Sequence, residues 1–338
     1  MKAMQLVYVA PLTEHHAPLI FTDVPIPEPE PEEVLIKVSA CGVCHTELDE
    51  IEGRLQPAIL PVIPGHQVVG RVHAVGAEVD RFELGNRVGV GWIYHSDASQ
   101  EENLSPDFRG TGCDADGGYA EYMCINQAYA VPIPDEFDDL HAAPLLCAGA
   151  IGYRALKLTH LVNGEPLGLM GFGGSGHIVM QLARYQYPDS PIFVFARGRE
   201  TRDFAIACGA DWAGATTDLA PSGCRAVIDT TPAWRPVIAA LENLKPGGRL
   251  IINAIRKEPD DQDALLHLSY HRHLWMEREI KSVANITHRD IAEFLPLAAR
   301  AGIRPKIEVY SLDDANDALI ALKFRPTRGA KVLDLTMA

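Results

Sequence analysis

The stretch Leu167-Gly-Leu-Met-Gly-Phe-Gly-Gly-Ser-Gly-His177 sets spaced glycines between an apolar run and a helical pattern. The first glycine of such a G-x-G-x-x-G turn permits a tight bend, the second lets the backbone approach a pyrophosphate, and the third lets helix and strand pack closely. The helix start adds N–H groups and the positive end of its dipole. We therefore predict a dinucleotide-binding turn, with an ordinary glycine turn as the alternative. Its residues are Gly171, Gly173, Gly174, Ser175 and Gly176.

On both sides of this turn, apolar runs of strand length alternate with helical stretches. The runs are residues 167–171, 192–195, 226–228 and 249–253, and the first helical stretch covers residues 177–185. This alternation indicates stacked βαβ units around a parallel sheet. We predict an α/β fold in which residues 153–287 form a Rossmann domain, a doubly wound parallel sheet.

The part of the chain before this domain has a different pattern. In residues 34–38 and 68–75, β-branched residues dominate between glycines and prolines, which is typical of short strands joined by irregular loops. Residues 1–152 are therefore expected to form a mostly-β domain. The terminal segment combines a helical pattern over residues 313–322 with a strand-like run over 331–335, and nothing local assigns it to either domain.

Composition limits the classes of partner. A chain of 338 residues exceeds one usual hydrophobic core, and its formal net charge of -15, without any Lys/Arg-rich run, argues against nucleic acid. No apolar run approaches the roughly 18 residues that span a bilayer. The seven cysteines are odd in number and scattered, which argues against a disulfide framework. We expect a cytoplasmic protein that binds no membrane.

The end of the second strand in a dinucleotide-binding domain usually carries an acid that bonds the ribose hydroxyls. Here that position holds Ala196, and Arg197 and Arg199 follow it. Without a carboxylate to repel a 2′-phosphate, and with two arginines to bind one, NADP(H) is the preferred cofactor. NAD(H) is the alternative cofactor, because arginines in loops are often solvated and would then not bind a 2′-phosphate.

Cys44, His66 and Cys147 are residues of the types that zinc accepts. Two cysteines and one histidine leave a fourth position for water or substrate, as catalytic zinc sites require. The separations of these three residues along the chain are not evidence of a metal site, and the evidence comes from the sequence segments around them. These segments are Cys41-Gly-Val-Cys-His-Thr-Glu47, Pro64-Gly-His-Gln67 and Leu145-Leu-Cys-Ala-Gly149.

In these three segments and in their order along the chain, the sequence resembles the zinc-containing medium-chain alcohol dehydrogenases. The resemblance extends to Asp116-Gly-Gly-Tyr-Ala-Glu121, to the glycine turn, and to the ending Arg328-Gly-Ala-Lys-Val-Leu. It implies a GroES-like, mostly-β catalytic domain over residues 1–152 that residues 288–338 complete. It also implies hydride transfer between NADP(H) or NAD(H) and a small-molecule alcohol or aldehyde.

Carried over by residue, the resemblance implies one catalytic zinc on Cys44, His66 and Cys147, with Cys41 as a neighbour only. His45 matches a position that contacts the cofactor pyrophosphate. Thr46 matches the hydroxyl that bonds the substrate oxygen and relays its proton. Trp92 matches an aromatic wall of the substrate pocket, and buried packing is its alternative.

The sequence departs from the family pattern in several places. The stretch 94–105, where the family usually carries four cysteines for a structural zinc, contains none, so we expect no structural zinc. Glu47 replaces the aspartate that orients the ligand histidine and can still accept its ring N–H from the second shell. Gln67 replaces a second-shell glutamate and removes a charge. Asp49 replaces a relay histidine, which leaves the proton path beyond Thr46 open.

Two other functions stay open at this stage. One is a zinc-free reductase of the quinone oxidoreductase type, and the other is a non-catalytic dinucleotide-binding protein. The resemblance also implies a homodimer or homotetramer, paired through the last strand of the cofactor domain near residues 279–284.

Overall fold

The computed structural model describes residues 1–325 and 329–337, so Arg328 of the expected family ending lies outside the described residues. The chain divides into two compact units. The first unit comprises residues 1–150 and 286–338, and the second comprises residues 151–285. The predicted α/β fold class is confirmed, because the second unit is built on a parallel sheet with helices and the first on a mostly antiparallel sheet.

The second unit has a six-stranded sheet whose neighbouring strands all run parallel. In spatial order the strands are β12 (Trp212–Gly214), β11 (Ile192–Phe195), β10 (Leu167–Met170), β13 (Cys224–Asp229), β14 (Leu244–Ile252) and β15 (Glu279–Ser282). Renumbered within the unit, this order is 3-2-1-4-5-6, that of a doubly wound dinucleotide-binding sheet. The strand order reverses between β10 and β13, and such sheets bind ligands outside the carboxyl ends at this point.

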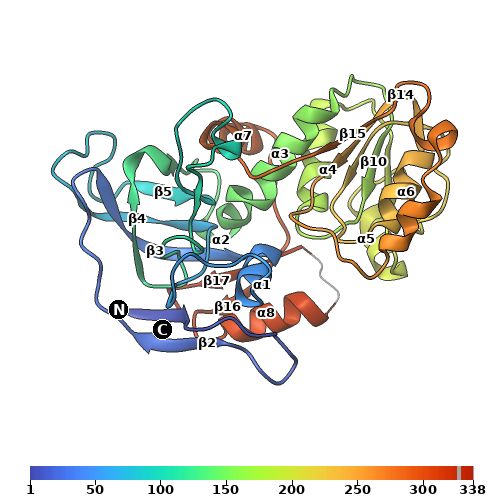
Figure 1. Cartoon of the computed structure of the whole chain (residues 1–338). Helices are drawn as coiled ribbons and strands as arrows, with labels where there is room; N and C mark the ends of the chain where they lie inside the picture. Colours follow the sequence, from blue (N-terminus) through green and yellow to red (C-terminus); the bar gives the residue numbers. More distant parts are fainter. Residues whose placement is uncertain (326–328, 338) are drawn as a thin grey trace. The chain divides into compact units, whose positions relative to one another are not determined.

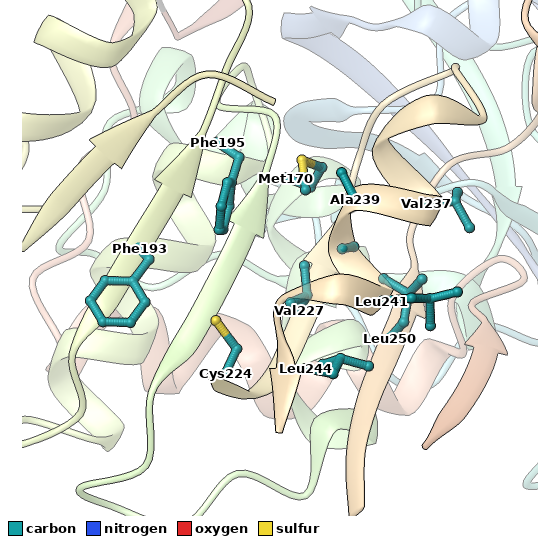
Figure 2. Packing of buried hydrophobic residues seen from close by; sticks show 11 residues of the cluster. Met170, Phe193, Phe195, Cys224, Val227, Val237, Ala239, Leu241, Leu244 and Leu250 are labelled. Carbon is teal, nitrogen blue, oxygen red and sulfur yellow. The ribbon is translucent and has the colours of Figure 1, made fainter. Parts of the chain in front are cut away.

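The central strands β10 and β11 are apolar and fully buried because helices cover both faces of the sheet. Figure 1 shows α6 (Arg235–Glu242) on one face, and α3 (Ala148–Thr159) and α4 (Gly176–Gln186) on the other. The fourth helix of this region, α5 (Arg199–Ala207), contacts β11 and β12. Figure 2 shows the core beneath α6, where side chains of the helix pack on those of the strands. Its labelled members include Phe193, Phe195, Val227, Val237 and Leu250.

One strand differs from its prediction. The apolar run predicted β14 from residue 249, whereas the strand begins at Leu244 and includes Lys245-Pro-Gly-Gly248. The pairing register with β13 shifts between Cys224 and Ala226, and Gly247 has a φ of 68°. A glycine in this left-handed conformation accommodates the irregularity, so the strand continues through residues that usually interrupt one.

The first unit is centred on β3 (Glu33–Val43), an eleven-residue strand that pairs antiparallel with three others. Its sheet has the order β16 (Ile307–Ser311), β17 (Ala330–Asp334), β3, β4 (Val68–Val75), β5 (Arg87–Val90) and β9 (Ala130–Pro132), and β8 (Tyr122–Asn126) also pairs with β3. The strand predicted over residues 331–335 is therefore β17. It carries the terminal segment into this unit.

The remaining elements of the first unit are short. The pairs β1 (Lys2–Leu6) with β2 (Leu19–Asp23), and β6 (Ile93–His95) with β7 (Arg109–Gly110), form two small sheets. The helices are α1 (His45–Ile51), α2 (Asp139–Ala142), α7 (His288–Arg300) and α8 (Ala315–Phe324), and α8 is the helix predicted over residues 313–322. Within residues 1–325 and 329–337, no helix is both long enough and apolar enough to cross a bilayer.

Candidate metal and cofactor sites

Cys44, His66 and Cys147 come from three separate segments and meet in the first unit. Their ligand atoms all lie within 4.8 Å of one another. His66 Nε2 lies 3.4 Å from Cys44 Sγ and 3.3 Å from Cys147 Sγ. Zinc–sulfur and zinc–nitrogen bonds of about 2.3 and 2.0–2.1 Å at a tetrahedral angle would separate these atoms by about 3.6 Å. The donor set and its spacing fit a zinc ion with one position left for another ligand.

The start of α1 places two of the groups around this cluster. Cys44 is the N-cap residue of α1, and its Sγ accepts a hydrogen bond from the Thr46 N–H at 3.4 Å. Glu47 Oε2 accepts the Cys44 N–H at 2.8 Å and completes a capping box. Its other oxygen, Oε1, lies 2.7 Å from His66 Nδ1, and both side chains are fully buried. One carboxylate therefore orients the two ligands Cys44 and His66 from opposite ends.

The protonation of the cluster depends on whether a cation is bound. The pKa of the Cys44 thiol lies well above its usual value, because it shares a hydrogen bond with Cys147, is buried and faces Glu47. A neutral thiol is a poor metal ligand. A divalent cation offsets this cost, since its charge stabilises both thiolates and expels their protons.

The other expected residues around the cluster are found at different depths. Thr46 and Gln67 are buried, whereas His45, the first residue of α1, is exposed. The Gln67 side chain lies against Gly42, where any Cβ would meet it at 2.8 Å. The ring centroid of Trp92 lies 5.9 Å from that of His66, next to Phe108. Cys41 is buried but is not one of the three clustered ligands.

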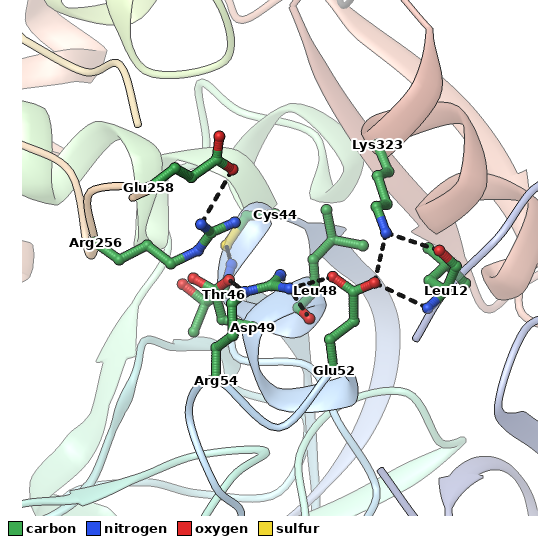
Figure 3. A network of polar contacts seen from close by, with 10 residues as sticks. All are labelled: Leu12, Cys44, Thr46, Leu48, Asp49, Glu52, Arg54, Arg256, Glu258 and Lys323. Atoms are coloured by element: carbon green, nitrogen blue, oxygen red, sulfur yellow. Dashed lines mark hydrogen bonds and ion pairs between the residues drawn. The ribbon is translucent and has the colours of Figure 1, made fainter. Parts of the chain in front are cut away.

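Asp49 is engaged in an ion pair rather than placed as a free base. Arg54 Nε donates to Asp49 Oδ1 at 2.7 Å, and the same guanidinium bonds Glu52 and the Leu48 carbonyl. Figure 3 shows this network continuing from Glu52 to Lys323 of α8. Arg54, which follows Asp49 by five residues, was not predicted from the sequence.

Glu50 is also a buried acid of α1, and it was not predicted from the sequence. Its side chain is fully buried, and neither carboxylate oxygen has a hydrogen-bond partner within the described residues. Burial, followed by the charge of Glu47, raises its pKa well above the usual range. The sequence signal was the run of residues 46–51, of which only Leu48 and Ile51 are apolar although all six are buried.

The cysteine-free stretch 94–105 is held by a buried carboxylate. Ser96 Oγ donates to Glu102 Oε2 at 2.7 Å, and the His288 N–H at the start of α7 donates to Glu102 Oε1 at 2.5 Å. Tyr129 adds to this clamp, because its hydroxyl accepts the Ser96 N–H at 2.9 Å. In the described residues the metal-type cluster is that of Cys44, His66 and Cys147, and none lies in this stretch. Glu102 thus joins segments 186 residues apart where the family pattern places zinc.

In the second unit, the glycine turn follows β10 and leads into α4. Gly171 has a φ of 87°, and a Cβ there would lie 2.7 Å from Thr230 Oγ1. A Cβ on Gly173 would meet nothing within 4 Å, and one on Gly176 would lie 3.0 Å from the Gly171 carbonyl oxygen. Bend, open approach and close packing therefore fall on the three glycines in the order expected of a pyrophosphate-binding turn.

Ala196 is buried at the end of β11, and the arginines that follow it are exposed. The side chain of Arg199 is 87% exposed and lies 3.8 Å from Asp203. A third arginine, Arg202, was not predicted from the sequence. Its Nη1 donates to the carbonyls of Ala196 and Arg197 at 2.9 and 2.8 Å and so fixes the backbone of the turn between β11 and α5.

Comparison with known proteins agrees with this architecture. Residues 30–135 match the family model "Alcohol dehydrogenase GroES-like domain". The chain is 41% identical over 321 residues to "Probable alcohol dehydrogenase AdhA" of Mycobacterium tuberculosis, which covers 91% of this chain and 90% of that protein. It is 32% identical to an alcohol dehydrogenase of Geobacillus stearothermophilus, over 96% of this chain and 98% of that protein.

A solved cinnamyl alcohol dehydrogenase from Sorghum bicolor superimposes with a TM-score of 0.84 at 27% identity, covering 100% of this chain and 98% of that chain. The chain belongs to the zinc-type medium-chain alcohol dehydrogenase family, and the expected family membership is confirmed.

The Glu102 clamp gives a test of stability. Glu102→Ala should lower the free energy of unfolding by about 3 kcal/mol, because it removes two hydrogen bonds to a buried carboxylate. Thermal and urea unfolding would measure the loss. The neighbouring exposed Glu101, changed to alanine, is the matched control. Equal stability of the two variants would show that Glu102 does not hold this stretch.

Proposed function

We propose that this protein is a zinc-dependent alcohol dehydrogenase and aldehyde reductase. The observation that carries the proposal is the cluster of Cys44, His66 and Cys147, whose three ligand atoms fit zinc and leave one position open. Membership in the alcohol dehydrogenase family and a glycine turn of pyrophosphate-binding geometry support it. The intact ligand set favours this reading over a zinc-free reductase or a non-catalytic dinucleotide-binding protein.

The residues of the first unit have distinct proposed roles. When bound, zinc supplies Lewis-acid polarisation of the alcohol or carbonyl oxygen, and a nicotinamide supplies the hydride transfer. Glu47 keeps His66 Nε2 turned toward the two thiols by holding its Nδ1. Thr46 moves the substrate proton through its hydroxyl. Because Asp49 is ion-paired with Arg54, we assign no proton transfer to Asp49.

The other predicted residues have proposed roles in binding the substrate and the cofactor. Trp92, beside His66, forms an apolar wall that orients the substrate carbon and keeps water away. The buried amide of Gln67 carries no charge, so it leaves the charge on the cluster to Glu47 and the thiolates. His45 and the glycine turn, with Gly171, Gly173, Gly174, Ser175 and Gly176, hold the cofactor pyrophosphate in this proposal.

We further propose that NADP(H) is preferred over NAD(H). Ala196 brings no carboxylate to the end of β11, and Arg197 and Arg199 project from an exposed turn that can receive a 2′-phosphate. Arg202 supports the preference indirectly, since it fixes the carbonyls of the same turn. None of the seven cysteines forms a disulfide bond, which supports a reducing cytoplasmic location.

A homo-oligomer, either dimer or tetramer, completes the proposal. β15 is the last strand in the order of its sheet, and all four of its residues are exposed. An uncovered edge strand presents a row of N–H and C=O groups to a second copy. A two-fold axis at this edge would extend the sheet from one protomer into its partner.

Metal analysis tests the zinc proposal. Protein purified without added zinc should hold about one zinc per chain, and Cys44→Ser should lose both the metal and alcohol oxidation, because two remaining ligands bind zinc poorly. Cofactor binding should survive, since the glycine turn lies in the other unit. Cys41→Ser is the matched control and should keep its zinc. A zinc content near two, or turnover retained by Cys44→Ser, would contradict the proposal.

Dissociation constants of NADPH and NADH test the cofactor preference. NADPH should bind about tenfold or more tightly, because one charge-assisted hydrogen bond contributes about 1.5–3 kcal/mol and about 1.4 kcal/mol corresponds to a factor of ten. Ala196→Asp should weaken NADPH binding by repulsion, and Arg197→Ala should weaken NADPH much more than NADH. The exposed Arg300 of α7, changed to alanine, serves as the control. Equal or tighter NADH binding by the unchanged protein would refute the preference.

Light scattering at micromolar concentration tests the assembly. The unchanged protein should have the mass of a dimer or tetramer, and Ile280→Lys on β15 should reduce it by placing a charge on the pairing edge. Val309→Lys on β16 is the matched control, since β16 also ends its sheet and Val309 is similarly exposed, at 40% against 43%. A monomeric mass for the unchanged protein would overturn the proposal.

A further inference from the structure

An ion pair lies buried at the carboxyl end of β13. Lys257 Nζ lies 2.5 Å from Asp229 Oδ2, and the two side chains are 8% and 0% exposed. The ammonium also donates to the carbonyls of Thr231 and Ala233 at 2.7 and 3.1 Å. All three of its N–H donors are therefore used. This saturation is what a charged amine requires in order to be buried.

Asp229 also accepts hydrogen bonds through its second carboxylate oxygen and its backbone carbonyl. Asp229 Oδ1 accepts the Thr231 N–H at 3.0 Å and the Thr231 hydroxyl at 2.8 Å. Its backbone carbonyl accepts the Asn253 N–H at 2.7 Å. The pair thus joins two loops, one after β13 (residues 230–234) and one after β14 (residues 253–261). A further bond, from the Glu258 N–H to the Pro232 carbonyl at 2.6 Å, joins the same loops.

The position of the first of these loops gives the pair a significance beyond packing. It leaves the sheet beside the glycine turn, at the point where the strand order reverses. Thr230 bonds the Met170 carbonyl through both its N–H and its hydroxyl, at 2.9 and 3.1 Å. A Cβ on Gly171 would lie 2.7 Å from Thr230 Oγ1 and 3.2 Å from Thr231 Cγ2. The loop therefore touches the turn that would carry the pyrophosphate.

We infer that Lys257 and Asp229 form a positioning pair for the dinucleotide, holding residues 230–234 as a fixed wall beside the glycine turn. The inference rests on the proposed function, since it takes the glycine turn as the cofactor site. Neither side chain needs to touch the cofactor. The Lys257 ammonium binds the carbonyls of Thr231 and Ala233, and the Asp229 carboxylate binds the N–H and hydroxyl of Thr231. The loop therefore has one conformation before the cofactor binds. Because residues 230–234 are already ordered, they lose no conformational entropy when the cofactor binds.

A lysine serves this role because of its geometry. A single Nζ donates in three directions, which suits one carboxylate and two carbonyls that lie two residues apart in one loop. A methionine of similar length would fill the space but leave Asp229 as a buried, unpaired charge and free both carbonyls. Loss of one partner from a buried pair is costly for this reason. The loop would then sample several conformations, and only some would admit the cofactor.

The test compares Lys257→Met with a matched lysine of the same unit. Lys245, at the other end of β14, pairs with Glu165 at 2.9 Å at the amino edge of the sheet, away from the glycine turn. Lys257→Met should raise the dissociation constants of both NADPH and NADH about tenfold, and by the same factor, because the pair acts on the glycine turn rather than on the 2′-phosphate. Lys245→Met should change either constant less than about twofold.

Further readouts separate positioning from stability. In steady-state assays Lys257→Met should raise the KM for cofactor and leave the KM for the alcohol and the zinc content unchanged. Lys257→Gln, which keeps donors for the carbonyls, should give an intermediate loss and provides a milder variant if Lys257→Met does not fold.

The outcomes distinguish the inference from the proposal beneath it. Failure of the unchanged protein to bind either nucleotide would overturn the proposed function and this inference with it. Normal binding by the unchanged protein, with Lys257 variants that melt at lower temperature but bind both cofactors as tightly, would overturn the inference alone. Tenfold weaker binding, equal for both cofactors and absent in Lys245→Met, is the result that the positioning role requires.

Discussion

A single buried carboxylate, that of Glu47, carries the geometry on which the candidate metal site depends. Its two oxygens contact Cys44, the N-cap residue of α1, and His66 in the segment before β4, and the ligand atoms of these two residues lie 3.4 Å apart. A rigid sheet brings these segments close to each other, but it does not set the orientation of an imidazole ring. The carboxylate does, and the ring in turn presents Nε2 to both thiols.

The same device recurs elsewhere in the chain. Glu102 joins the stretch around Ser96 to the start of α7, and Asp229 joins the loops that follow β13 and β14. In each case the two oxygens accept from donors of different segments, which an apolar contact cannot align and a neutral hydroxyl can align only in part. Burial makes each bond stronger and each unpaired acid more costly, so these contacts fix one arrangement of the backbone.

Sequence patterns predicted the parts of the structure that depend on local periodicity. The parallel strands, the glycine turn and the helix at α8 follow from runs of a few residues, and the ligand set of Cys44, His66 and Cys147 followed from resemblance. The clamp at Glu102 and the pair of Asp229 with Lys257 were not predictable in this way. Glu102 and His288 are 186 residues apart, and Asp229 and Lys257 are 28 residues apart. No local pattern in one segment predicts its contact with the other.

The Asp49 position shows why a departure from a family pattern has to be judged in three dimensions. From the sequence, an aspartate in place of a relay histidine is compatible with a changed proton path or with none. In the fold its carboxylate is held by Arg54, whose guanidinium also serves Glu52 and the end of α1. The position therefore holds an ion-paired carboxylate that ties α1 to Arg54, and we assign no proton transfer to this side chain.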